Sequence, residues 1–166
     1  MIDPPANPTP AVHSEGLVLG RWLATDAARV LEIARDPDTR AWSPSMRPLR
    51  TEADALTWMT TRTANDERVD WAVRDATSGL LVGRVGFYRL DKQSRSAEIG
   101  YGVHPEHRRR GVALRAVTAA SAYAFTTLNL ARISLVHATG NHASCAVARA
   151  VPSMVKPTFS ATRRDA

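Results

Sequence analysis

The stretch Val103-His104-Pro105-Glu106-His107-Arg108-Arg109-Arg110-Gly111-Val112-Ala113-Leu114 decides the fold. It follows a run with strand alternation and leads into a long helical pattern, so it predicts a strand, a basic loop and a helix. The N–H groups and the positive dipole end at the start of such a helix form an anion site that phosphate groups commonly occupy. The alternative for three adjacent arginines is a solvated basic loop or a nucleic-acid patch.

Length and composition are those of a single soluble domain. The chain has 166 residues, of which 44% are hydrophobic and 23% are charged. Lysine and arginine outnumber aspartate and glutamate by 22 to 16, and the net charge of +6 favours an anionic ligand or partner. The single cysteine, Cys145, excludes an internal disulfide and fits a reducing compartment, so we expect a cytoplasmic protein. No apolar run approaches the roughly 18 residues needed to cross a membrane, and we expect neither insertion nor secretion.

The pattern along the chain divides it into three regions. We expect 1–14, which is rich in proline, to be a disordered lead-in, 15–150 to form one domain, and 151–166 to be a divergent tail. Within the domain, strands are predicted at 16–22, 71–74, 80–90, 96–103 and 132–138. Helices are predicted to start near Thr25, Thr51 and Val112 and after Asn141. Antiparallel strands with helices before and between them predict a mixed α/β domain.

The strand at 96–103 has two different faces. The odd-numbered residues from Ala97 to Val103 are apolar or aromatic and fall on one face, as in an ordinary core strand. The even-numbered residues Glu98, Gly100 and Gly102 fall on the other face, and the two glycines would leave room there for a ligand. From this strand alone, an equally good explanation is that the glycines serve twist or a bulge and that Glu98 is solvated.

The basic loop and its surroundings resemble the GNAT superfamily of acyl-CoA-dependent N-acyltransferases. Arg108-x-x-Gly111-x-Ala113 matches that family's Gln/Arg-x-x-Gly-x-Gly/Ala signature. Ala97-Glu98-Ile99-Gly100-Tyr101, followed by Val103-x-Pro105-Glu106, is similar to the branch containing ribosomal-protein N-terminal acetyltransferases and related small-molecule acetyltransferases. Asn141-His142-Ala143-Ser144 resembles that branch's Asn-x-x-Ser at the start of its following helix. The resemblance extends over residues 16–150.

The resemblance implies a mixed, mostly antiparallel, twisted sheet with helices on both faces. It also implies acetyl-CoA as the acyl donor, with its pyrophosphate on the loop amides and its pantetheine arm in a splay between two strands. The residues that it implies for acetyl-CoA binding are Tyr101, Gly102, Val103, Arg108, Arg109, Arg110, Gly111, Val112, Ala113 and Asn141. Arg109 departs from the pattern, since many relatives have another glycine there, and we expect a stiffer loop.

The chemistry of amine acetylation requires a base for the amine proton, donors for the developing oxyanion and an acid for the departing thiolate. Glu98 is the candidate base, acting through water. Ser144 is, by resemblance, the candidate acid or thiolate hydrogen-bond donor; the alternative is a first-turn residue satisfied by the helix backbone. Cys145 is better explained as a buried residue than as a nucleophile. The five histidines lack metal-ligand spacing, and no metal is assigned.

The resemblance stops near residue 150. Relatives continue with a Gly-Phe turn and two strands that complete the sheet and wall the acceptor site, whereas this chain continues Val151-Pro152-Ser153. At most one short strand is expected, within 155–160, so the last two strands are predicted to be missing or degraded. A frameshift near codon 150 or a natural truncation would explain this. The strand at 132–138 would then have an unpaired edge that invites a second copy of the chain as a homodimer. We expect coenzyme binding to be retained and catalysis to be weakened.

The sequence therefore predicts transfer of an acetyl group from acetyl-CoA to a primary amine, either a protein N-terminus or a small molecule such as an aminoglycoside or a polyamine. Two alternatives stay open. One is a non-catalytic acyl-CoA sensor. The other is a nucleic-acid-binding module that uses the basic residues Arg108, Arg109, Arg110, Arg163 and Arg164, although no helix-turn-helix or aromatic stacking platform supports it.

Overall fold

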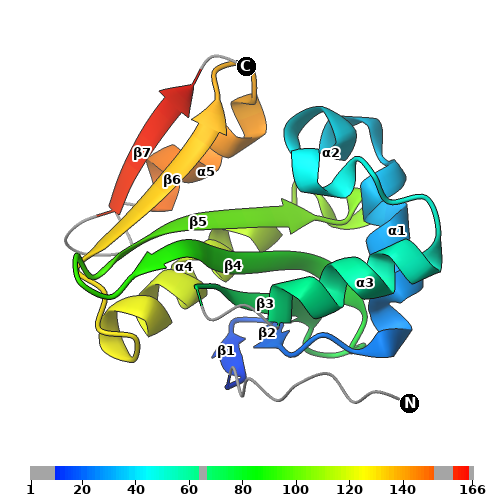
Figure 1. Ribbon diagram of the computed structural model, residues 1–166, viewed down its shortest axis with the longest axis horizontal. Coiled ribbons are helices and arrows are strands. Elements are labelled where there is room, and N and C mark those ends of the chain that lie inside the picture. The colour runs from blue at the N-terminus through cyan, green and yellow to red at the C-terminus, as the bar shows by residue number, and fades with distance from the viewer. Residues whose placement is uncertain (1–9, 64–66, 152–158, 165–166) are drawn as a thin grey trace.

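A computed structural model describes residues 10–63, 67–151 and 159–164 (Figure 1). Seven strands form one sheet in the order β1-β2-β3-β4-β5-β6-β7. Neighbouring strands are antiparallel from β1 to β5 and parallel from β5 to β7. Helix α4 packs on one face of the sheet, and α3 with α1 packs on the other. The predicted mixed α/β fold with helices on both faces is confirmed.

The elements have the following bounds. The strands are β1 (Val12–Ser14), β2 (Leu17–Gly20), β3 (Val69–Asp75), β4 (Leu81–Asp91), β5 (Ser96–Val103), β6 (Arg132–Ala138) and β7 (Phe159–Arg164). The α-helices are α1 (Ala27–Arg35), α2 (Pro37–Trp42), α3 (Glu52–Thr63), α4 (Val112–Thr126) and α5 (His142–Ala150). Short 3-10 turns lie at Ala24–Asp26, Pro44–Met46 and Pro105–His107.

The caps predicted for α3 and α5 are confirmed. Thr51 Oγ1 accepts from the N–H of Asp54 at 3.2 Å, and Asp54 Oδ2 accepts from the N–H of Thr51 at 2.9 Å. This reciprocal pair satisfies two of the N–H groups that a helix start leaves without partners. Asn141 Oδ1 accepts from the N–H of Ser144 at 3.1 Å and so caps α5. Thr25, in contrast, lies in a 3-10 turn, and α1 begins at Ala27.

Two expectations for the ends of the domain are wrong. Val12–Ser14, placed in the disordered lead-in, forms β1 and pairs with β2, while residues 1–9 lie outside the described residues. At the other end Phe159–Arg164 forms β7, which pairs with β6 from Ile133↔Phe159 to Ala138↔Arg164. Strand β6 therefore has no unpaired edge over that stretch, and the reason given for a homodimer does not hold. Residues 152–158 lie outside the described part of the chain.

Two hydrophobic cores hold the sheet between its helices. Between the sheet and α4, the buried ring of Trp71 packs edge-on against Tyr123 with centroids 5.4 Å apart. Between the sheet and α1 with α3, Trp22 packs edge-on against Trp58 at 5.7 Å. Burial of these large rings supplies much of the apolar area that stabilises the fold. Each face of the sheet is therefore packed against helices, and this packing restrains the strands β4, β5 and β6.

Gly83 in β4 sits where the neighbouring strand comes too close for a side chain. A Cβ at Gly83 would lie 2.5 Å from the backbone oxygen of Gly102, whereas a Cβ at Gly20 would meet nothing within 4 Å. We expect Gly83→Ala to lower the free energy of unfolding by about 1–3 kcal/mol, because β5 must shift. The control Gly20→Ala should change it by less than about 1 kcal/mol. Urea denaturation measures both, and equal stabilities would contradict the close approach.

Candidate functional site

The basic loop ends in an uncapped helix start. Gly111 occupies the N-cap position of α4 with φ of 70°, and Arg109 has φ of 59°. Glycine adopts this left-handed conformation freely, whereas an arginine there costs about 1–2 kcal/mol. The first-turn N–H groups from Val112 to Leu114 have no acceptor within the helix, and no acidic side chain stands in that turn. The helix start has the form that the sequence predicted for an anion site.

Arg108 ties this loop to the junction of α1 and α2. Its guanidinium contacts Asp36 Oδ2 at 2.5 Å and Asp38 Oδ2 at 3.2 Å. Burial alone would raise the pKa of Asp36, but hydrogen bonds from Arg108 and Thr39 hold it below its ordinary value. The Arg108 side chain is therefore committed to positioning the loop. The side chains of Arg109 and Arg110 are exposed.

His104 anchors the start of the loop from inside the protein. Its ring is buried, and Nδ1 accepts from the N–H of Glu106 at 3.3 Å. The proton is therefore on Nε2, which donates to Glu32 Oε2 at 2.8 Å. Within residues 10–63, 67–151 and 159–164, no group of three or more His, Cys, Asp or Glu side chains is placed to bind a metal ion.

Strands β5 and β6 separate partway along their length. Their parallel pairing runs from Ser96↔Arg132 to Ile99↔Leu135 and does not continue. Beyond these pairs the two strands diverge, β5 staying beside β4 and β6 staying beside β7 (Figure 1). Tyr101, Gly102 and Val103 lie on the β5 side of the opening. The splay that the resemblance implied is present in the fold.

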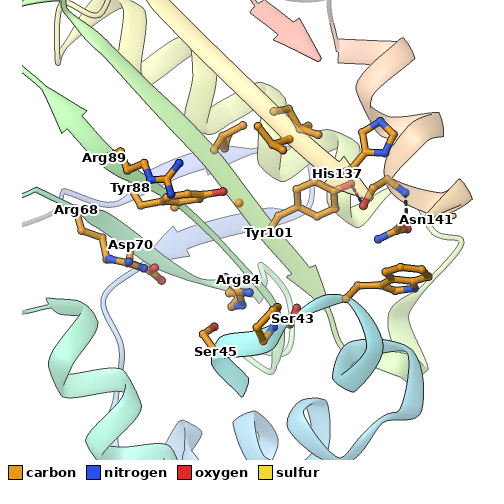
Figure 2. A pocket seen from close by; sticks show the side chains of 18 of the residues that line it. Ser43, Ser45, Arg68, Asp70, Arg84, Tyr88, Arg89, Tyr101, His137 and Asn141 are labelled. Carbon is orange, nitrogen blue, oxygen red and sulfur yellow. Dashed lines mark hydrogen bonds between the residues drawn. The ribbon is translucent and has the colours of Figure 1, made fainter. Parts of the chain in front are cut away.

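A cavity of about 650 Å³ lies at this splay and extends beneath α2 over β4 (Figure 2). We call one part the splay end, which contains Tyr101, His137, Asn141 and Ser144. We call the other the basic end, which contains Arg62, Arg68, Asp70, Arg84, Tyr88 and Arg89. Figure 2 shows Arg68, Asp70 and Arg89 on one side of the cavity and Tyr101, His137 and Asn141 on the other.

At the splay end, two hydroxyl groups meet. The Tyr101 hydroxyl donates to Ser144 Oγ at 3.0 Å, and Ser144 itself sits in the first turn of α5, capped by Asn141. Burial raises the pKa of Tyr101 above its ordinary value, although the hydrogen bond to Ser144 opposes the rise. The phenol is therefore protonated at neutral pH. The ring of His137 is buried nearby, and its Nδ1 donates to the Ala138 oxygen at 3.0 Å.

At the basic end, one buried ion pair stands among several arginines. Arg62 Nη1 contacts Asp70 Oδ2 at 3.2 Å, and Asp70 Oδ1 accepts from Trp22 Nε1 at 3.2 Å. Arg62 Nη2 also donates to Ser45 Oγ at 2.9 Å. Burial, with the nearby charge of Arg84, lowers the pKa of Arg62 to about 10. Asp70 is thus fully engaged in holding Arg62 and Trp22.

The glycine face of β5 is partly covered: Gly100 lines the cavity, but side chains from β4 lie close to both glycines. A Cβ at Gly100 would lie 3.1 Å from Cε1 of Tyr88, and a Cβ at Gly102 would lie 3.5 Å from Nε of Arg84. Side chains from the neighbouring strand β4 therefore occupy the space that the two glycines leave. The space expected beside Gly100 and Gly102 is thus narrower than the sequence suggested, because strand alternation gives the face of a residue and not which side chains the next strand places over it.

Glu98 lies beside the cavity without lining it. Its Oε1 accepts from Arg89 Nη1 at 2.5 Å. Burial raises the pKa of Tyr88, and the charge of Glu98 and a hydrogen bond to it raise that pKa further. Tyr88 and Arg89 both line the cavity, so they stand between Glu98 and its interior. Glu98 could therefore reach the cavity interior only through water or through the Tyr88 hydroxyl.

Sequence reasoning missed the whole basic end. Asp70 and Arg84 carried the usable signal, since each is a charged residue within a strand whose neighbours are apolar. Charged side chains are rarely placed there unless paired or functional. The sequence could not show that these two residues lie close to Arg62, because Arg62, Asp70 and Arg84 come from α3, β3 and β4 respectively.

In the described part of the chain, no helix is both long and apolar enough to cross a membrane.

Comparisons with known sequences agree with this geometry. The family model for the acetyltransferase (GNAT) domain matches residues 17–151. The chain is 38% identical over 76 residues to the uncharacterised N-acetyltransferase YoaA of Bacillus subtilis (strain 168), covering 46% of this chain and 43% of YoaA. It is 36% identical over 77 residues to YdaF of the same organism, proposed to be a ribosomal N-acetyltransferase, covering 46% of this chain and 40% of YdaF. The matched segment is thus less than half the length of either relative.

A solved structure with the same fold is spermidine N-acetyltransferase from Vibrio cholerae in complex with CoA and spermine. It has a TM-score of 0.71 and 22% identity, covering 82% of this chain and 79% of that chain. At this identity the likeness shows the fold alone. The family match, in contrast, runs through most of the chain and includes the basic loop, the splay and Tyr101. This protein therefore belongs to the GNAT acetyltransferase family.

Proposed function

We propose that this chain transfers an acetyl group from acetyl-CoA to a primary amine, by direct attack of the amine on the thioester. The observation that carries the proposal is the splay of β5 from β6, which opens on the Tyr101–Ser144 hydroxyl pair inside one cavity. Family membership supports the reaction class. The Vibrio cholerae enzyme with the same fold binds CoA, which supports the choice of donor.

Two backbone features would hold acetyl-CoA. The N–H groups from Arg109 to Ala113 would donate to its phosphates, assisted by the dipole of α4 and by the exposed charges of Arg109 and Arg110. The β5 backbone from Tyr101 to Val103, which β6 does not pair, would bond to the pantetheine arm much as it would to an added strand. Asn141 uses its side-chain oxygen to cap α5, so its NH₂ group is the part that would contact that arm.

Tyr101 is the proposed acid. As the new N–C bond forms and the C–S bond breaks, the protonated Tyr101 phenol would give its proton to the departing thiolate. Ser144 Oγ, which lies 3.0 Å from the phenol oxygen, would then donate a hydrogen bond to the phenolate until a proton from solvent restores the phenol. In this proposal Tyr101 takes the acid role for which the sequence suggested Ser144, and Ser144 supports Tyr101 through a hydrogen bond.

Glu98 is the proposed base. It would take the amine proton through a water molecule or through the hydroxyl of Tyr88, which lines the cavity. Arg89 fixes the orientation of the Glu98 carboxylate. Asp70 is poorly placed for this task, because hydrogen bonds already occupy both of its oxygens.

Tyr101→Phe tests the proposal through the release of free thiol from acetyl-CoA in the presence of a primary amine. We expect kcat to fall about 10²-fold, with the KM for acetyl-CoA changed by less than about twofold, because only proton transfer is lost. Tyr123→Phe is the matched control, since Tyr123 lies in α4 and does not line the cavity. Wild-type protein that releases no thiol with any amine would overturn the function. An unchanged kcat in Tyr101→Phe would overturn the role of Tyr101.

A further inference from the structure

The basic end of the cavity carries more positive charge than the neighbouring carboxylates neutralise. We propose that the acceptor is a small amine that also carries an anionic group, a carboxylate or a phosphate, and that Arg68 and Arg84 bind this group. The inference rests on the proposed function and names its substrate class. It concerns the opposite end of the cavity from the Tyr101–Ser144 pair.

The charges divide into paired and unpaired ones. Arg62 is paired with Asp70 at 3.2 Å, and Arg89 is paired with Glu98 at 2.5 Å. Among the residues that the structure describes, no carboxylate forms an ion pair with Arg68 or Arg84, since Asp70 pairs with Arg62 and Glu98 pairs with Arg89. Two guanidinium groups therefore line the cavity without a counter-charge of their own.

Arg84 is the more informative of the two, because its position is unfavourable without a ligand. Its guanidinium lies 5.5 Å from the ring centroid of Trp58, and its Nε is buried with no recorded hydrogen-bond partner in the described part of the chain. Burial lowers the pKa of Arg84, and the charge of Arg68 lowers it further, while Asp70 opposes the change. A buried charge without a partner costs several kcal/mol, which a bound anion would offset. Guanidinium groups bind carboxylate and phosphate oxygens through paired hydrogen bonds.

Arg68 lies close enough to contribute to the same anion subsite. Its guanidinium lies 5.7 Å from the ring centroid of Tyr88, and both residues line the cavity. In Figure 2, Arg68 and Tyr88 lie at the end of the cavity that is remote from Asn141, and Arg84 lies between them and the splay end. An anion between the two arginines would be approached by the guanidinium of Arg84 from β4 and by that of Arg68, which directly precedes β3.

The anion at the basic end is not expected to be a phosphate of acetyl-CoA. The predicted phosphate site is the start of α4, and none of the loop residues from Arg108 to Ala113 lines the cavity. The cavity instead joins the basic end to the hydroxyl pair at which the thioester would react. A group bound by Arg68 and Arg84 therefore belongs to the acceptor, with its amine directed towards Tyr101.

This charge distribution disfavours polyamines. A second ammonium group would approach the unpaired guanidinium groups, and juxtaposed like charges cost several kcal/mol. The spermine complex of the Vibrio cholerae enzyme therefore does not identify the acceptor of this chain, because the two share only the fold. The cavity volume of about 650 Å³ is in the range for small-molecule sites.

The test compares kcat/KM for four amines of similar length that differ in their far end: γ-aminobutyrate, aminopropylphosphonate, n-butylamine and putrescine. We expect kcat/KM for at least one anionic amine to exceed that for n-butylamine by about 10- to 100-fold, which is the usual effect of a hydrogen bond to a charged group. Putrescine should have the lowest kcat/KM of the four. Comparison of the carboxylate with the phosphonate identifies which anion the subsite prefers.

Arg84→Met and Arg68→Gln assign the effect to these side chains. Each should remove most of the preference for the anionic amine and leave kcat/KM for n-butylamine within about twofold. Arg132→Met, at an exposed position outside the cavity, should leave the preference intact. If the wild-type kcat/KM for n-butylamine or putrescine equals or exceeds the kcat/KM for both anionic amines, the inference is overturned while the proposed function stands. Turnover of none of the four would overturn the inference, whereas the proposed function falls only if no primary amine of any kind, a peptide N-terminus included, releases thiol from acetyl-CoA.

Discussion

Asp70→Asn is expected to lower the free energy of unfolding by about 3–5 kcal/mol, because it leaves a buried positive charge without its partner. The Asp70 side chain is 3% exposed and that of Arg62 is 10% exposed, so water would replace the lost carboxylate only poorly. The neighbouring charge of Arg84 makes the environment of Arg62 still less favourable. The variant also weakens the hydrogen bond that Trp22 donates to Asp70 at the edge of the second core. Chemical denaturation in urea measures the change.

An exposed ion pair provides the control for this prediction. Asp38 contacts Arg108 at 3.2 Å with its side chain 78% exposed, and Asp38→Asn should cost less than about 1 kcal/mol. The double variant Asp70→Asn with Arg62→Leu should recover much of the loss, since it removes the stranded charge as well. A cost below about 1 kcal/mol for Asp70→Asn alone would show that Arg62 does not depend on this carboxylate.

The sequence predicted the part of the site that is local along the chain. Ser96–Val103, Val112 and Asn141 stand where the strand, the helix start and the helix cap were expected, because alternation, helical spacing and capping act over a few residues. The left-handed backbone at Arg109 also fits the glycine that many relatives have there. The splay itself was implied by the family resemblance and not by any local pattern.

What the sequence could not provide depends on neighbours that are remote in the chain. Tyr88 and Arg84 cover the glycine face of β5 from β4, and Arg62 meets Asp70 between α3 and β3. The one tail strand that the sequence allowed, within 155–160, lies instead at Phe159–Arg164 for a similar reason: the backbone of β7 is held by pairing with β6, and its own sequence carries little strand pattern. Each of these features is a tertiary contact that no short window of sequence contains.

The central claim is that the start of α4 and the splay beside it bind acetyl-CoA, and Gly111→Glu is expected to abolish that binding. Position 111 lies at the N-cap, where a carboxylate would stand against the phosphates and compete for the same N–H groups. A Cβ at Gly111 meets only Arg115 Nε, at 3.9 Å, so the fold has room for the substitution. The positive φ of 70° adds backbone strain that a control must match.

Gly79→Glu is that control. Gly79 lies in the turn between β3 and β4 with φ of 72°, and a Cβ there would meet nothing within 4 Å. The two variants thus share the same new charge and the same backbone strain. Titration calorimetry should give dissociation constants for acetyl-CoA that agree within about twofold between the wild type and Gly79→Glu. The dissociation constant of Gly111→Glu should be at least about 10³-fold higher. Wild-type affinity in Gly111→Glu, or no binding by the wild type, would contradict the account.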